Sequence, residues 1–150
     1  MIIDSHLHIS ITAGEKNFDE VKNKLVLEMK KNGINKAIII PDNLHNTLCA
    51  DSDMVEKLIK DDEKFLMIST LQAEEVNVKN IEKIEQLFLN KKTVGFKIFP
   101  GHDPVRPNDK RWLPIINLCI KHNLPFVIHT GINLNDKTVA KYNDPKYIVQ

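Results

Sequence analysis

Five short apolar runs, rich in β-branched residues, alternate along the chain with longer amphipathic segments. The runs are residues 1–5, 36–40, 65–71, 94–99 and 125–129. Each run is too short for a free-standing helix, and the central residues of the second and fifth runs are typical of strands buried on both faces. Strands that recur about every 30 residues, with helices between them, are expected to be parallel and joined by helical crossovers. This alternation restricts the chain to the α/β class.

The intervening segments carry apolar side chains at helical spacing. The four stripes are Phe18, Val21, Leu25 and Met29; Met54, Val55, Leu58 and Ile59; Ile81, Ile84 and Phe88; and Trp112, Ile115, Ile116 and Cys119. The signals at the helix ends are Asn32-Gly33 as a stop for the first helix, Asp51 or Ser52 as a cap for the second, and Asn108 or Asp109 as a cap for the fourth. Stripes of this kind predict core packing and by themselves indicate no cofactor.

Two architectures fit this alternation, an open doubly wound sheet and a closed barrel. No glycine-rich phosphate-binding pattern such as GxGxxG follows the first run, which disfavours a nucleotide-binding doubly wound sheet. A complete eight-stranded barrel takes about 250 residues. This sequence of 150 residues supplies five strands and four helices, followed by residues 132–150, for which no element is predicted. Both architectures stay open at this point, and if the chain belongs to a barrel, the arithmetic suggests that the sequence stops inside a larger fold.

The composition excludes several classes of function. Apolar residues make up 42% of the chain and charged residues 27%, which is ordinary for a globular protein. With 21 basic and 20 acidic side chains the net charge is +1, so bulk electrostatics favours neither nucleic acid nor a membrane surface. No run approaches the ~20 apolar residues of a membrane span, and no signal peptide is visible. The two cysteines, Cys49 and Cys119, lack CxxC spacing, and we expect a cytoplasmic protein in which Cys119 is a buried thiol.

Three histidines fall at the ends of predicted strands. His6 and His8 follow the first run, and His129 ends the fifth. Side chains alternate along a strand, so His6 and His8 point to the same side and can chelate one divalent metal. A lone histidine after an apolar strand is more often structural, and an HxH pair alone is a weak signal. Barrel active sites lie at the carboxyl ends of strands, however, and three nitrogen ligands with an open position describe a catalytic metal site.

Lys97 is an ionisable residue in the strongly apolar fourth run. Either its amine reaches solvent at the strand end, or it is held at the mouth of the site as a carbamate-type metal ligand or as a cation facing an anionic substrate. His102 and Arg106 lie in the proline-rich loop that follows this run. Contact with substrate is one interpretation for both residues, and a solvated loop is the other.

Three motifs together resemble the amidohydrolase superfamily. They are Asp-Ser-His-Leu-His at residues 4–8, Gly-Phe-Lys-Ile-Phe-Pro at residues 95–100 and Val-Ile-His-Thr-Gly at residues 127–131. Their order and spacing are similar to those of the amidohydrolase-related family, which also includes nonoxidative decarboxylases, and the resemblance spans residues 2–147. The resemblance implies an α/β fold of the (β/α)8 TIM-barrel type, present as an incomplete barrel of about five βα units. Residues 1–150 would then be the N-terminal portion of a single domain. TatD-type nucleases share the first motif but are expected to carry a glutamate at the position of Lys97, which makes them a weaker match.

The resemblance implies that His6, His8 and His129 bind a divalent metal, with Zn²⁺ as the first choice. Lys97 matches a lysine that bridges two metals as a carbamate in some branches, whereas the branch that contains decarboxylases usually holds one metal. The family also uses a later histidine, and an aspartate that binds the metal and takes the proton from its water. Both would lie beyond residue 150, so no catalytic base is identified in this sequence.

The activity that the resemblance implies is that of a metal-dependent hydrolase, in which metal-activated water attacks an amide, ester or lactone carbon of a small-molecule substrate. A nonoxidative decarboxylase of the same family is the alternative, and a non-catalytic βα interaction domain is the second alternative. Without strands six to eight the chain is expected to be a poor catalyst by itself. Unpaired edges of the first and fifth strands would favour self-association, including a homo-oligomer.

Overall fold

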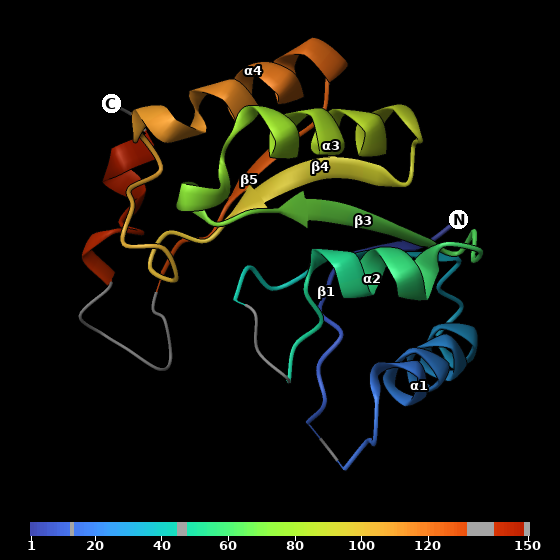
Figure 1. Ribbon diagram of the computed structural model, residues 1–150. Coiled ribbons are helices and arrows are strands. Elements are labelled where there is room, and N and C mark those ends of the chain that lie inside the picture. The colour runs from blue at the N-terminus through green and yellow to red at the C-terminus, as the bar shows by residue number, and fades with distance from the viewer. Residues whose placement is uncertain (13, 45–47, 132–139, 149–150) are drawn as a thin grey trace. The chain divides into compact units, whose positions relative to one another are not determined.

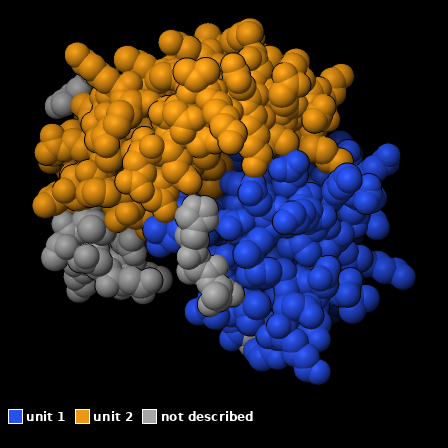
Figure 2. All heavy atoms as spheres, viewed as in Figure 1, with its two compact units in different colours: residues 1–69 blue, residues 70–150 orange. Residues whose placement is uncertain are grey.

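The computed structural model describes residues 1–12, 14–44, 48–131 and 140–148. The chain divides into two compact units, Met1–Ser69 (unit 1) and Thr70–Gln150 (unit 2), which Figure 2 shows in different colours. Each unit has its own hydrophobic core. Within the described part of the chain, no helix is both long enough and apolar enough to cross a lipid bilayer.

Unit 1 alternates strands and helices. Its elements are β1 (Ile3–Leu7), α1 (Phe18–Lys31), β2 (Lys36–Ile39), α2 (Ser52–Ile59) and β3 (Phe65–Thr70), the last residue of which begins unit 2. β2 lies between β1 and β3 and pairs in parallel with both. Each helix is the crossover between two parallel strands, as the alternation in the sequence predicts.

The core of unit 1 packs α1 and α2 against one face of the strands. It includes side chains from alternate strand positions and from the helices: Ala37, Ile39, Phe65, Met67, Met29, Val55 and Ile59. Ile9 belongs to this core, and Leu7 packs against it. Because side chains alternate along a strand, the residues next to Leu7 and Ile9 point to the other face. This parity decides where His6 and His8 lie.

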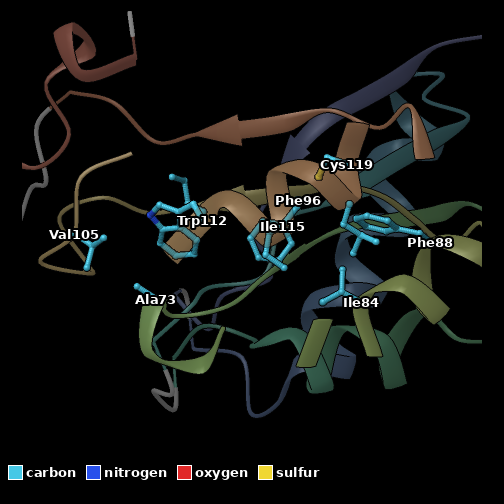
Figure 3. Packing of buried hydrophobic residues seen from close by; sticks show 10 residues of the cluster. Ala73, Ile84, Phe88, Phe96, Val105, Trp112, Ile115 and Cys119 are labelled. Atoms are coloured by element: carbon cyan, nitrogen blue, oxygen red, sulfur yellow. The ribbon is translucent and has the colours of Figure 1, made fainter. Parts of the chain in front are cut away.

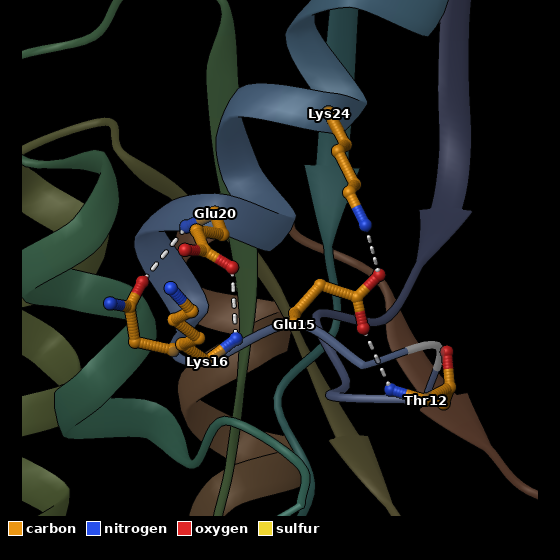
Figure 4. Close-up of polar contacts among 6 residues, drawn as sticks. Thr12, Glu15, Lys16, Glu20 and Lys24 are labelled. Atoms are coloured by element: carbon orange, nitrogen blue, oxygen red, sulfur yellow. Dashed lines mark hydrogen bonds and ion pairs between the residues drawn. The ribbon is translucent and has the colours of Figure 1, made fainter.

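Hydrogen bonds to side chains and an ion pair stabilise the segment between β1 and α1 (Figure 4). Glu15 accepts a hydrogen bond from the Thr12 N–H at 3.1 Å and forms an ion pair with Lys24 at 2.8 Å. The N–H of Glu20 donates to the side chain of Asn17, which is the N-cap of α1, at 3.0 Å. These contacts satisfy N–H groups that the loop and the helix start would otherwise leave open, and they fix the path of the chain after β1.

Unit 2 contains α3 (Val78–Leu89), β4 (Thr93–Ile98), α4 (Leu113–His122) and β5 (Phe126–Ile128). Short 3₁₀ helices lie at Ala73–Glu75, Lys110–Trp112 and Pro145–Ile148. β4 and β5 are parallel, with Phe96 opposite Phe126. Helices α3 and α4 cover one face of this strand pair (Figure 1).

The core of unit 2 lies between this strand pair and its two helices (Figure 3). Its buried members are Ala73, Ile84, Phe88, Phe96, Ile98, Val105, Trp112, Ile115, Leu118 and Cys119. Phe96 and Ile98 are the contribution of β4, so the side of β4 that faces the helices is apolar there. Cys119 is the buried thiol that the sequence predicts, and burial raises the pKa of this thiol to about 11.

The helices begin and end close to their predicted positions. α1 ends at Lys31 with Asn32 as its C-cap, and Asp51 caps α2 by accepting a hydrogen bond from the Met54 N–H at 2.9 Å. The fourth helix differs, because Asp109 caps a 3₁₀ turn at Lys110–Trp112, and α4 itself starts only after this turn, at Leu113. A proline in the first turn of α4 suits this start, since the missing N–H would have no partner within the helix.

Two predictions about the strands are wrong. β1 spans Ile3–Leu7 rather than residues 1–5, because its register on β2 shifts between Asp4 and Leu7 and pairing continues past this irregularity. Complete burial on both faces is not found either, because Ile38 in β2 and all of β5 are only half-buried. Among the described residues of unit 2, β5 pairs with β4 alone and packs against helices on one face, so part of its surface stays accessible.

Candidate metal centre

His6 and His8 lie at the carboxyl end of β1, His6 within the strand and His8 just after it. Leu7 and Ile9, which alternate with them, pack with the core of unit 1, so the two imidazoles are on the face away from α1 and α2. Both histidines are exposed, and their ring centroids lie 5.3 Å apart with the planes inclined by 59°. The N–H of His6 donates to the Asp4 carboxylate at 3.1 Å, which supports the backbone at the register shift.

Lys97 lies on the face of β4 that points away from the helices. Its neighbours Phe96 and Ile98 are in the core of unit 2, and Lys97 itself is only 3% exposed. The ammonium nitrogen lies 4.5 Å from the centroid of the Phe99 ring, a cation–π contact that offsets part of the cost of burying a charge. The interpretation in which this amine reaches solvent at the strand end is therefore wrong.

Three aromatic rings gather beside Lys97 in unit 2. The Phe99 ring is nearly parallel to that of His102, with centroids 5.1 Å apart, and it stacks on His129 at 6.1 Å. The rings of His102 and His129 are themselves 6.1 Å apart. His129 directly follows β5, and its N–H donates to the carbonyl of Ile98 in β4 at 3.0 Å.

Phe99 and Asp103 are residues of this region that the sequence analysis did not single out. Phe99 stands two positions after Lys97, so strand parity was the signal that could have placed both on one face. Asp103 is 6% exposed, and its carboxylate accepts a hydrogen bond from the Ala73 N–H at 3.3 Å. Burial raises the pKa of this carboxyl to about 6, although the hydrogen bond from Ala73 acts in the other direction. No sequence pattern separates Asp103 from an exposed loop aspartate.

Arg106 contacts a different part of unit 2. Its guanidinium carbon lies 4.3 Å from the centroid of the Tyr147 ring. The residue also lines an open cleft of about 440 Å³, together with Lys110 and Tyr142. Of the two loop residues that were predicted to contact substrate, the structure thus brings His102 next to His129, whereas Arg106 packs on the C-terminal segment.

The donor atoms suit a divalent transition metal, because imidazole is a common ligand of zinc, iron and nickel. Two imidazoles that share one ion at about 2.1 Å have ring centroids on the order of 5 Å apart. The 5.3 Å between His6 and His8 fits such a chelate. In the described ranges of the chain, no group of three or more His, Cys, Asp or Glu side chains gathers in a way that could hold a metal ion. His6 and His8 belong to unit 1 and His129 to unit 2, so the three-histidine centre stays a prediction.

Comparisons with known proteins bear on the fold. No family model and no curated protein sequence matches the chain. Among solved structures, it is similar to a variant of 5-carboxyvanillate decarboxylase from Novosphingobium aromaticivorans with bound manganese and 3-methoxy-4-hydroxy-5-nitrobenzoic acid. The identity is 12%, and the TM-score is 0.62 over 99% of this chain and 55% of the other.

The chain therefore spans about half the length of the solved chain that it matches. A likeness at this level of identity shows the fold, which is an incomplete TIM-barrel-like α/β fold. The predicted fold class, an incomplete barrel of the (β/α)8 type, is confirmed.

Proposed function

We propose that this chain is part of a metal-dependent enzyme of the amidohydrolase type, and that its reaction is the nonoxidative decarboxylation of an aromatic carboxylate. The observation that carries the proposal is the likeness over 99% of the chain to a decarboxylase whose structure holds manganese and a nitrobenzoic acid. Hydrolysis is the first expectation from the sequence, and this likeness favours its alternative instead. The HxH pair at the carboxyl end of β1 supports a metal-dependent reaction of either kind.

In this proposal His6, His8 and His129 hold the divalent ion. Zn²⁺ is the choice that imidazole ligands favour, and the manganese in the similar structure makes Mn²⁺ the ion to compare with it. When bound, the ion supplies Lewis acidity, which polarises an oxygen of the substrate.

Lys97 is proposed to orient the carboxylate of the substrate. Its ammonium group is buried against the Phe99 ring, where little water competes for the charge. In the reaction, the bond between the carboxyl carbon and the substrate carbon breaks, and carbon dioxide leaves. The electron pair stays on the substrate carbon, which then takes a proton. A fixed positive charge beside the reacting carboxylate would position it for this bond cleavage.

Hydrolysis of an ester or lactone is the second candidate. The observation that favours it is the exposure of His6 and His8, because a hydrolase must admit water as the nucleophile. The same three histidines would hold the ion in both reactions. Only the substrate that the protein accepts therefore distinguishes decarboxylation from hydrolysis.

The test is a paired assay on the intact protein loaded with Zn²⁺ or Mn²⁺. One arm measures carbon dioxide release from 5-carboxyvanillate and related hydroxybenzoates, and the other measures acid release from phenyl acetate and a simple lactone. We expect carbon dioxide release that disappears in the His6→Ala/His8→Ala variant. Acid release alone would support the hydrolase instead, and metal binding without either activity would favour the non-catalytic interaction domain.

A further inference from the structure

The ring of His102 lies next to that of His129 inside unit 2. Their centroids are 6.1 Å apart and their planes are inclined by 35°. Both rings also stack on Phe99, which comes from the end of β4. His102 is half-buried, so its imidazole is supported on one side and remains accessible on another. An ion bound at His129 would therefore have a second imidazole close by.

The backbone that carries His102 is held in a tight turn. The Phe99 carbonyl accepts hydrogen bonds from the N–H groups of His102 at 3.0 Å and Asp103 at 3.1 Å. Gly101 adopts a φ of +103°, which favours glycine, and its N–H donates to the Asp103 carbonyl at 2.8 Å. The carboxylate of Asp103 accepts from the Ala73 N–H, which ties the turn to a second segment. A side chain on such a support is preorganised for ligand binding.

We propose that His102 is a further ligand of the metal ion that His129 binds, so that unit 2 presents a two-histidine chelate of its own. The inference rests on the proposed function only through the role of His129. Two imidazoles on one ion have centroids on the order of 5 Å apart, so a shift of about 1 Å in the half-buried His102 ring completes the pair. An added imidazole favours Co²⁺, Ni²⁺ and Zn²⁺ over Mn²⁺.

The test is titration of the intact chain with Co²⁺, whose visible absorption reports the number and kind of its ligands, alongside calorimetry. The His6→Ala/His8→Ala variant leaves only His102 and His129, which we call the unit 2 pair, and in this variant Co²⁺ binding should persist at lower affinity. Adding His102→Ala or His129→Ala to that variant should abolish it. In the otherwise unchanged protein, His102→Ala should alter the spectrum and weaken binding by at least the roughly tenfold that even outer-sphere changes cause.

His102→Phe is the matched variant, because it keeps a ring on Phe99 but has no nitrogen to bind an ion. Circular dichroism checks its fold, and its Co²⁺ affinity should fall as in His102→Ala. His122→Ala is the control, since His122 contacts Glu85 of α3 at 2.8 Å, and it should leave the affinity unchanged.

An unchanged affinity and spectrum in His102→Phe would overturn the inference. Complete loss of binding in His6→Ala/His8→Ala would also overturn it, because the unit 2 pair would then bind nothing. Neither result contradicts the proposed roles of His6, His8 and His129. Those roles fail separately, if Co²⁺ binds equally well without these three residues.

Discussion

The carboxyl group of Asp103 is buried directly after His102, and burial raises its pKa to about 6 from an ordinary value of 3.8. Between these two values the folded protein holds a proton at Asp103 that the unfolded chain has released. The free energy of unfolding therefore falls as the pH rises through this window, by roughly 1–3 kcal/mol in total. The contribution is fully present below about pH 4 and is lost above about pH 6.

Asp103→Asn should remove this pH dependence, because an amide oxygen can still accept the Ala73 N–H but does not titrate. We expect the variant to match the wild type near about pH 4 and to be more stable by roughly 1–3 kcal/mol near about pH 7. Urea unfolding at both pH values measures the difference. Asp19→Asn, at an exposed carboxyl in the first turn of α1, is the control. A stability difference that does not vary with pH would contradict the prediction.

The contact between the Lys97 ammonium and the Phe99 ring can be measured with a double-mutant cycle. Lys97→Met keeps most of the volume and removes the buried charge, so alone it should cost little or even stabilise. Phe99→Leu removes the ring from the ammonium group and should cost about 2 kcal/mol. We expect a coupling energy of roughly 0.5–2 kcal/mol between the two changes. Phe126→Leu is the control, because the Phe126 ring stacks on Phe96, and its effect on the free energy of unfolding should add to that of Lys97→Met. If the effects of Phe99→Leu and Lys97→Met are also additive, the contact between Lys97 and Phe99 is refuted.

At the scale of elements, the close approach of β4 to the start of β5 depends on Gly95. A Cβ at this position would lie 2.9 Å from the Pro125 carbonyl oxygen and 3.0 Å from its Cγ. That carbonyl also accepts the Phe96 N–H at 3.0 Å, so the added methyl must push the two segments apart where they are hydrogen-bonded. We expect Gly95→Ala to lower the free energy of unfolding by about 1–3 kcal/mol.

Hydrogen exchange locates this effect, because the Phe96 amide should lose protection in Gly95→Ala. Gly33→Ala is the control, since a Cβ at Gly33 meets nothing within 4 Å and its φ is +67°. Gly33→Ala should lower the free energy of unfolding by about 1–2 kcal/mol, because an alanine is strained in this left-handed backbone conformation. The protection of the Phe96 amide relative to its neighbours should not change. Equal protection of Phe96 in both variants would mean that β4 and β5 absorb the methyl without separating.

The helices were the elements that the sequence predicts best, because their signals are local. The stripe that begins at Phe18 and the Asn32-Gly33 stop place α1 closely, and Asp51 caps α2 as predicted. The limits of β1 were less predictable, since the register shift after Asp4 arises from pairing with β2 and no local pattern encodes it. The 3₁₀ turn before α4 was not predicted either, because Trp112, its one apolar residue, keeps a helical spacing with Ile115 and Cys119.

The candidate site was predictable as far as it follows strand parity. The same-side placement of His6 and His8 comes from counting along a strand, and the same count could have placed Lys97 and Phe99 on one face of β4. The position of His102 does not, because it depends on a turn closed by backbone hydrogen bonds and on rings from two strands. The role of Phe99 could not be predicted either, because its ring contacts come from separate segments of the chain and the residue by itself reads as one more apolar strand residue.

At the scale of the whole molecule, the proposed metal ligands are divided between two units that each hold a core, with His6 and His8 in one and His129 in the other. A ligand that binds only the folded chain raises the free energy of unfolding by about 2.7 kcal/mol at roughly one hundred times its Kd. If one ion takes nitrogen ligands from both units, saturating Zn²⁺ should raise the Tm by on the order of 5–10 °C.

Variants in each unit decide whether one ion depends on both. We expect His6→Ala and His129→Ala each to remove most of the rise in Tm, although they lie in different units, because the loss of a nitrogen ligand weakens binding at least about tenfold. His122→Ala on α4 should keep the full rise, and calorimetry should count one ion per chain in the wild type. A rise in Tm that survives His129→Ala would mean that His6 and His8 bind the metal without unit 2, and the three-histidine centre would be wrong. Two ions per chain, one lost with each variant, would show instead that the two units bind metal separately.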